Sequence, residues 1–165
     1  KNRKRVYELV KKHSGCHFRE LERKTKLSTG VLKYHLDFLH KHDLIKLEKD
    51  GNHTRYYPSN LQFENRRLLG LLRQKSIRNI IIFMLSNKQS YFRGIVNSSG
   101  LSASTVSWHI KKLLKNEIIA QGRVGRKTVY KLLISEEEVV RLLIAYKESF
   151  LDSLVNKTIE MWDIK

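Results

Sequence analysis

Apolar residues recur at helical spacing in three successive stretches near the start of the chain. We expect helices over about 2–13, 17–25 and 29–42. The inward-facing apolar residues of the first and third helices are Val6, Leu9, Val10, Leu32, Leu36 and Leu39. Ser28 stands just before the third helix, where a serine hydroxyl can accept a hydrogen bond from a free backbone N–H. The pattern therefore predicts one helix followed by a helix-turn-helix.

After the third helix the spacing changes from helical to alternating. The segment LIKLEKDGNHTRYYP at 44–58 contains the turn sequence Asp50-Gly51-Asn52, which predicts a β-hairpin. A helix, a helix-turn-helix and a hairpin with a basic tip make up the plan of a winged helix.

The whole pattern returns 74 residues later, without a gap, from Val6/Ile80 to Tyr56/Tyr130. LKYHLDFLHKHDLI at 32–45 is matched by VSWHIKKLLKNEII at 106–119, and His35 and His109 are identical. Helices are expected at about 76–87, 91–99 and 103–116, with Ser102 as the N-cap and a hairpin turn at Gly125. Two copies of one small fold is the economical interpretation.

Two stretches lie outside the repeat. Residues 61–75 have a helical pattern and are expected to join the two copies stiffly. The tail opens with SEEE at 135–138, a capping box with acid in the first helical turn, and is expected to run as one helix to about Trp162. Its wide apolar stripe must be buried, either against the connector or in a homodimer through 136–162. We favour the homodimer.

The expected fold class is mainly α with small β-hairpins (α+β), with two tandem winged helix-turn-helix domains and a long C-terminal helix. The expected domains are winged-helix domain 1 at 1–60, a connector helix at 61–75, winged-helix domain 2 at 76–134 and a C-terminal amphipathic helix at 135–165. The chain starts at Lys1 rather than Met, so we expect it to be part of a longer protein.

The distribution of charge along the chain indicates what kind of partner the protein binds. The chain has a net charge of +17, divided as +8 over 1–60, +12 over 61–134 and −3 over 135–165. The basic charge therefore belongs to the repeated domains and indicates a polyanionic partner. The single cysteine, Cys16, excludes an internal disulfide framework. The sequence also has no signal peptide and no apolar run long enough to cross a membrane, so we expect a cytoplasmic protein without membrane contacts.

These segments resemble the ArsR/MarR-type winged-helix transcription regulators, in particular archaeal regulators with tandem winged domains. The second copy, LSASTVSWHIKKLLKNEII, is similar to the family's turn and recognition helix almost throughout. The first copy keeps the apolar frame and the histidine but departs at Gly30, Leu32 and Lys33. The resemblance covers roughly 6–57 and 80–131, and it implies a DNA-binding regulator of transcription.

A recognition helix must bury one stripe and present the other to the major groove, while basic wing tips contact the DNA backbone or minor groove. Gly30 and Lys33 replace hydroxyl-bearing positions of the second copy, so the copies read different bases, or one positions the other. The residues expected to contact double-stranded DNA are Ser28, Thr29, Lys33, Tyr34, His35, Arg55, Ser102, Ser104, Thr105, Ser107, Trp108, His109, Lys112, Arg123, Arg126 and Lys127. For the two histidines, packing under the wing is an equally weighted alternative.

Other classes of function fit less well. Tandem winged domains can serve as protein-interaction scaffolds, or as RNA or single-strand binders, and the aromatic pair Tyr34/Trp108 favours the last of these. The histidines and Cys16 lack the spacing of a metal site, so no metal and no cofactor is expected. Segment 61–134 holds only two acids and the chain has no catalytic motif, so no enzyme is expected. The transcription machinery is a further expected partner.

Overall fold

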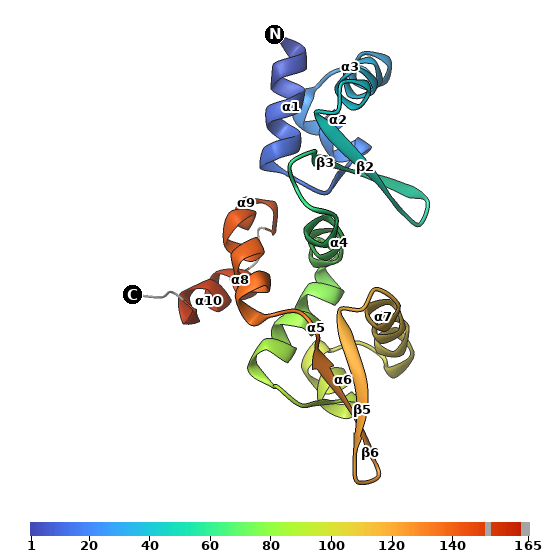
Figure 1. Cartoon of the computed structure of the whole chain (residues 1–165), viewed down its shortest axis with the longest axis vertical. Coiled ribbons are helices and arrows are strands. Elements are labelled where there is room, and N and C mark those ends of the chain that lie inside the picture. Colours follow the sequence, from blue (N-terminus) through green and yellow to red (C-terminus); the bar gives the residue numbers. More distant parts are fainter. Residues whose placement is uncertain (151–152, 163–165) are drawn as a thin grey trace. The chain divides into compact units, whose positions relative to one another are not determined.

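The computed structural model describes residues 1–150 and 153–162 (Figure 1). Within them the chain forms two compact units. The first contains residues 1–70 with the short segment 148–150, and the second contains 71–147 with 153–162.

The first unit packs three helices against a small antiparallel sheet. Its elements are α1 (Asn2–Lys12), β1 (Cys16–His17), α2 (Phe18–Thr25), α3 (Thr29–Lys41), β2 (Ile45–Asp50) and β3 (His53–Pro58). The strand order is β1-β3-β2, and Asp50 pairs with His53 across the hairpin turn. Gly51 makes that turn at a φ of 60°, a conformation that glycine adopts without steric cost. The core residues are Val6, Val10, Cys16, Leu21, Leu32, Leu36, Leu39, Ile45 and Tyr56.

The second unit repeats this plan. Its corresponding elements are α5 (Lys75–Ser86), β4 (Ser90–Tyr91), α6 (Phe92–Ser99), α7 (Ala103–Lys115), β5 (Ile119–Val124) and β6 (Lys127–Leu132). Its sheet has the matching order β4-β6-β5. Even the irregular backbone is repeated, because Asp43 and Glu117 follow the third helices at φ values of 55° and 56°. The predicted fold class, α+β with tandem winged helix-turn-helix domains, is confirmed.

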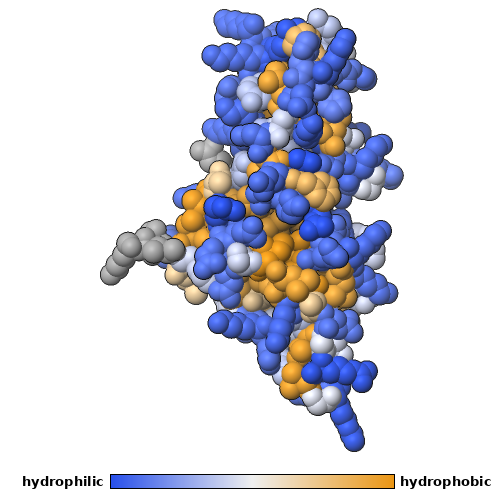
Figure 2. Space-filling model, viewed as in Figure 1, coloured by the Kyte–Doolittle hydropathy of each residue, from blue (hydrophilic) through white to orange (hydrophobic). Residues whose placement is uncertain are grey.

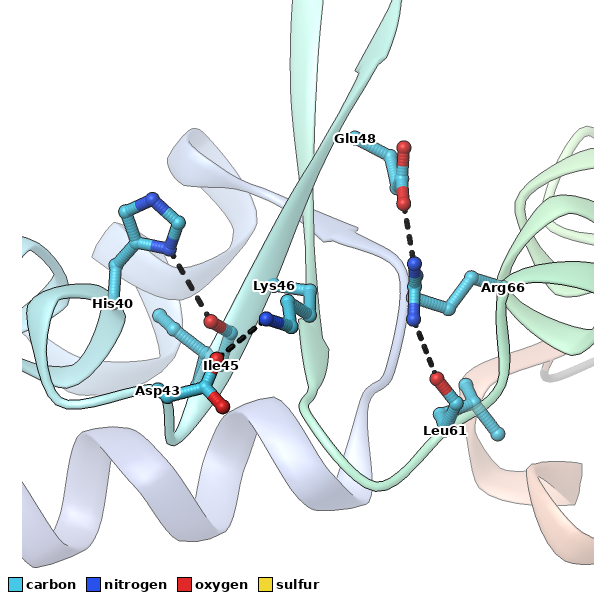
Figure 3. Close-up of polar contacts among 7 residues, drawn as sticks. All are labelled: His40, Asp43, Ile45, Lys46, Glu48, Leu61 and Arg66. Atoms are coloured by element: carbon cyan, nitrogen blue, oxygen red, sulfur yellow. Dashed lines mark hydrogen bonds and ion pairs between the residues drawn. The ribbon is translucent and has the colours of Figure 1, made fainter.

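The connector contains α4 (Phe63–Leu72), most of which belongs to the first unit. Arg66 of α4 donates from Nε to Glu48 Oε1 of β2 at 2.8 Å and from Nη1 to the Leu61 carbonyl at 2.6 Å (Figure 3). A Cβ at Gly70 would lie 2.6 Å from the Tyr57 hydroxyl, so α4 approaches β3 closely only because position 70 has no side chain. These contacts fix α4 against the base of the first wing.

The tail is not the single helix that its sequence predicts. It forms α8 (Glu136–Ala145), α9 (Lys147–Phe150) and α10 (Ser153–Met161). The α8 helix ends at Tyr146, and α10 packs against both α8 and α5. Val155 and Thr158 of α10 are buried, so folding back lets one apolar stripe cover another within the same unit. None of the helices in residues 1–150 and 153–162 has the length and apolar character needed to cross a membrane.

Candidate nucleic-acid interface

Three hydroxyls form a cluster at the start of α7. Ser102 caps the helix, and its Oγ accepts a hydrogen bond from the Thr105 backbone N–H at 3.2 Å. The same oxygen lies 3.1 Å from Ser104 Oγ and 2.8 Å from Thr105 Oγ1. This N-terminal turn is where a recognition helix presents side chains to base edges. Because hydroxyls donate and accept, the cluster could hydrogen-bond to bases or phosphates.

The outward side of α7 carries a line of exposed residues, which we call the α7 ridge. It consists of Ser104, Trp108, Lys111 and Lys115, all exposed and spaced four, three and four residues apart. Trp108 is 59% exposed, while Val106, Ile110 and Leu113 are buried on the opposite side. Ser107 lies at the flank of the ridge, half-buried. The helix thus buries one stripe and presents another, as the sequence predicted.

Lys112, a predicted contact, lies beside the ridge. It is half-buried, donates from Nζ to Gln74 Oε1 at 3.3 Å, and its ammonium lies 5.7 Å from the Trp108 ring centroid. Its neighbour Lys111, absent from the predicted contacts, is exposed on the ridge. The signal that could have found it is the helical spacing from Trp108.

The corresponding α3 ridge consists of Gly30, Tyr34, Asp37 and Lys41, all exposed. Tyr34 is 60% exposed, matching Trp108. Ser28 precedes α3 but makes no side-chain capping hydrogen bond, while the Thr29 hydroxyl bonds to the Glu22 carboxylate. Lys33 forms an exposed ion pair with Asp37 at 2.8 Å. The α3 ridge therefore matches the α7 ridge in position and exposure, but it has a carboxylate, Asp37, beside its predicted DNA contacts.

His35 and His109 lie on the flanks of these helices. His109 is only 8% exposed, and its ring packs edge-on against Trp108 with centroids 5.2 Å apart. His35 is half-buried and meets Tyr34 in a similar way at 5.4 Å. The buried Nδ1 atom of each has no hydrogen-bond partner within the part of the chain that the structure describes. For His109 this placement favours the packing alternative over a direct DNA contact.

Burial lowers the pKa of His109, and the positive charge of Lys112 lowers it further, from an ordinary value of 6.5. The unfolded chain therefore binds this proton more readily than the folded chain, and protonation favours unfolding. We expect the stability of the second domain to fall as the pH decreases below 6.5. Thermal unfolding at neutral and mildly acidic pH should show a smaller acid loss for His109→Gln than for the wild type. Parallel losses in both proteins would contradict this assignment.

The second wing, β5–β6, presents its basic residues openly. Arg123, Arg126 and Lys127 are all exposed around the turn at Gly125. Both hydrophilic and hydrophobic residues lie at the end of this hairpin in the space-filling view (Figure 2), and Val124 beside the turn is 46% exposed. Lys127 also lines an open groove of about 660 Å³ between β6 and the start of α6. The groove is lined as well by Arg93, an exposed cation that was not among the predicted contacts. Phosphates approaching this wing would meet cations at its tip and at its base.

The first wing differs from its prediction at Arg55. Rather than reaching out to DNA, Arg55 is 6% exposed, pairs with Asp50 at 2.9 Å, and donates to the Gly15 carbonyl at 2.8 Å. Its guanidinium ties β3 to the hairpin turn and to the loop before β1, so it is structural. The exposed polar residues of this wing are Lys49, Asn52 and His53. The ring of His53 stacks on His17 with centroids 4.8 Å apart.

Comparison with known families gives the interface its context. Residues 1–69 match a family described as an N-terminal HTH domain, and residues 75–121 match one described as bacterial regulatory protein, arsR family. Both domains are helix-turn-helix domains. In these two helix-turn-helix domains, α3 and α7 occupy the recognition-helix position.

A relative from Methanocaldococcus jannaschii, an uncharacterized HTH-type transcriptional regulator, is 30% identical over 128 residues. The match covers 78% of this chain and 32% of the relative, so the chain spans about a third of the relative's length. A crystal structure of a protein from Corynebacterium diphtheriae covers 80% of this chain and 26% of its own, with 14% identity and a TM-score of 0.34, a likeness too slight to bear on fold or function.

Proposed function

We propose that the chain is the DNA-binding part of a transcription regulator, and that it binds double-stranded DNA sequence-specifically with two recognition helices and basic wings. Contact with the transcription machinery belongs to the same proposal. The observation that carries it is the pair of exposed ridges on α3 and α7, each beside a hairpin with at least one exposed cation. A ridge of this kind suits the major groove, and such hairpins suit the flanking backbone.

Salt titration tests the proposal directly. Each phosphate that the protein neutralises contributes a log–log slope of about −0.9 to the salt dependence of duplex affinity. We expect a steep slope for a duplex selected from a random pool, measured by fluorescence anisotropy, and weaker binding to a scrambled duplex. Affinity that does not change with salt, or equal affinity for both duplexes, would overturn the proposal.

A single-strand or RNA binder is the second candidate, because Tyr34 and Trp108 are 60% and 59% exposed at matching positions. Exposed aromatic rings are stacking platforms for unpaired bases. The same anisotropy measurement with the single strand and with RNA of equal sequence separates the two candidates. Tighter binding to either of these than to the selected duplex would favour this alternative.

We also propose homodimerisation through 136–162. Although α10 covers part of α8, Ile144 and Met161 remain 51% and 76% exposed. Apolar side chains this exposed on neighbouring helices suit a self-complementary contact. Light scattering at micromolar concentration is expected to give the mass of two chains, and Ile144→Asp with Met161→Asp is expected to give that of one. A wild-type mass of one chain would contradict the dimer.

A further inference from the structure

The two ridges can be compared residue by residue, because the repeat aligns them at an offset of 74. Gly30 corresponds to Ser104, so the second domain gains a hydroxyl at this position. Tyr34 corresponds to Trp108 and Lys41 to Lys115, so these two pairs keep their aromatic and basic character. The remaining pair reverses its charge. Asp37 in the centre of the α3 ridge corresponds to Lys111 in the centre of the α7 ridge, and both are exposed.

A difference in net charge extends over the matched windows of the two domains. Window 16–58 holds nine basic and six acidic residues, which gives a net charge of +3. The matched window 90–132 holds eight basic residues and one acidic residue, which gives +7. Glu22 corresponds to Val96, and Asp50 to Val124. The first domain is therefore less basic because it carries more carboxylates, with a similar number of cations.

Those carboxylates are bonded to side chains that the sequence predicted as DNA contacts. Asp37 holds the Lys33 ammonium at 2.8 Å, Glu22 bonds to the Thr29 hydroxyl, and Asp50 pairs with the buried Arg55. On α7, no ion pair of Lys111 or Lys115 is found among residues 1–150 and 153–162. The hydroxyls at the start of α7 bond to one another, and hydroxyl-to-hydroxyl bonds exchange readily for bonds to a base or phosphate.

We propose that the two domains divide the work: α7 is the principal base-reading helix, with Lys111 as a direct DNA contact, while Asp37 limits the affinity of α3 for DNA. This inference rests on the proposed function. A carboxylate on the ridge faces the phosphates with like charge, and it also occupies Lys33, whose ammonium would otherwise release a counterion from the duplex. The first domain then contributes positioning contacts rather than most of the sequence preference.

A reciprocal charge exchange tests the division. Lys111→Asp is expected to weaken binding to the selected duplex by at least about tenfold and to reduce discrimination against the scrambled one. Asp37→Lys is expected to tighten binding to both duplexes by about twofold to tenfold and to steepen the salt slope by about one phosphate or more, because it frees Lys33 as well as adding a charge. Both positions are exposed, and thermal unfolding by circular dichroism checks that each variant folds.

The matched control is Lys88→Asp, the same charge change at an exposed position between α5 and β4, which should leave affinity nearly unchanged. Three results would overturn the inference. They are equal losses from Lys88→Asp and Lys111→Asp, no loss from Lys111→Asp, and loss of base preference in Asp37→Lys. The last would mean that Asp37 itself reads a base, since a carboxylate can accept from the cytosine N4 amino group. Failure of the proposed function gives a different result, because the wild type would then not prefer the selected duplex.

Discussion

Replacing Arg123 and Arg126 together by alanine is expected to weaken binding to every duplex by roughly tenfold to a hundredfold at low salt. Both guanidinium groups are exposed at the tip of the second wing. Contacts to phosphates carry no sequence information, so the loss should be nearly the same for selected and scrambled duplexes. The salt slope should become shallower by up to about 1.8, which is two phosphate contacts.

The matched control for this double variant lies in the first wing, where Lys49 and Asn52 occupy the corresponding positions. Alanine at both should cost less, because only one cation is lost. Thr105→Ala and Ser107→Ala provide the opposite contrast. They should relax base preference by about 1–3 kcal/mol at one or two base pairs while leaving the salt slope unchanged. A change of base preference in the arginine variant, equal to that in the hydroxyl variants, would contradict this separation of roles.

Asp50→Ala is expected to destabilise the first domain by about 2–3 kcal/mol, because it leaves the guanidinium of Arg55 inside the domain without its carboxylate. The Arg55 side chain is 7% exposed and that of Asp50 is 24% exposed, so water screens the pair only in part. Native-state hydrogen exchange can assign the loss to amides of residues 1–70. Amides of the second domain serve as the internal reference.

The second domain supplies the control for this prediction. Its residues at the corresponding positions are Val124 and Val129, and Val129 is buried. The double variant Asp50→Val with Arg55→Val removes both charges together, and it should be more stable than Asp50→Ala. Recovery should remain partial, because the Gly15 carbonyl loses the donor that Arg55 provides. Wild-type stability in Asp50→Ala would contradict a structural role for the pair.

The fold was predictable because its signals are local and occur twice. The spacing of Leu32, Leu36 and Leu39, and its repetition at Val106, Ile110 and Leu113, predicted the helices α3 and α7. All six of these side chains are buried. The tail was harder, because a wide apolar stripe fits one long helix or two shorter helices that cover each other equally well. The choice depends on tertiary packing against α5, which leaves no mark on helical spacing.

The site was predictable in outline and not in detail. Alternation along the hairpin could not show that Arg55 points into the domain, because an arginine in a strand is usually exposed. Comparison of the two copies could have shown it, since Arg55 corresponds to Val129, and a valine at that position indicates burial. Lys111 and Lys112 are adjacent in α7, so which of them faces solvent depends on how the helix is turned against the core. The side-chain contact of Lys112 with Gln74, 38 residues away, settles that orientation.

The shared left-handed residues after α3 and α7 mean that these two helices end in the same backbone geometry. Four outward positions on each helix lie on that common framework, and all of them are exposed. In the proposed function, target preference therefore depends on residues of each helix other than those that stabilise the core. Transplanting the Ser104, Trp108, Lys111 and Lys115 set onto α3 would leave the interior unchanged. If the proposed division of work holds, both domains would then read bases.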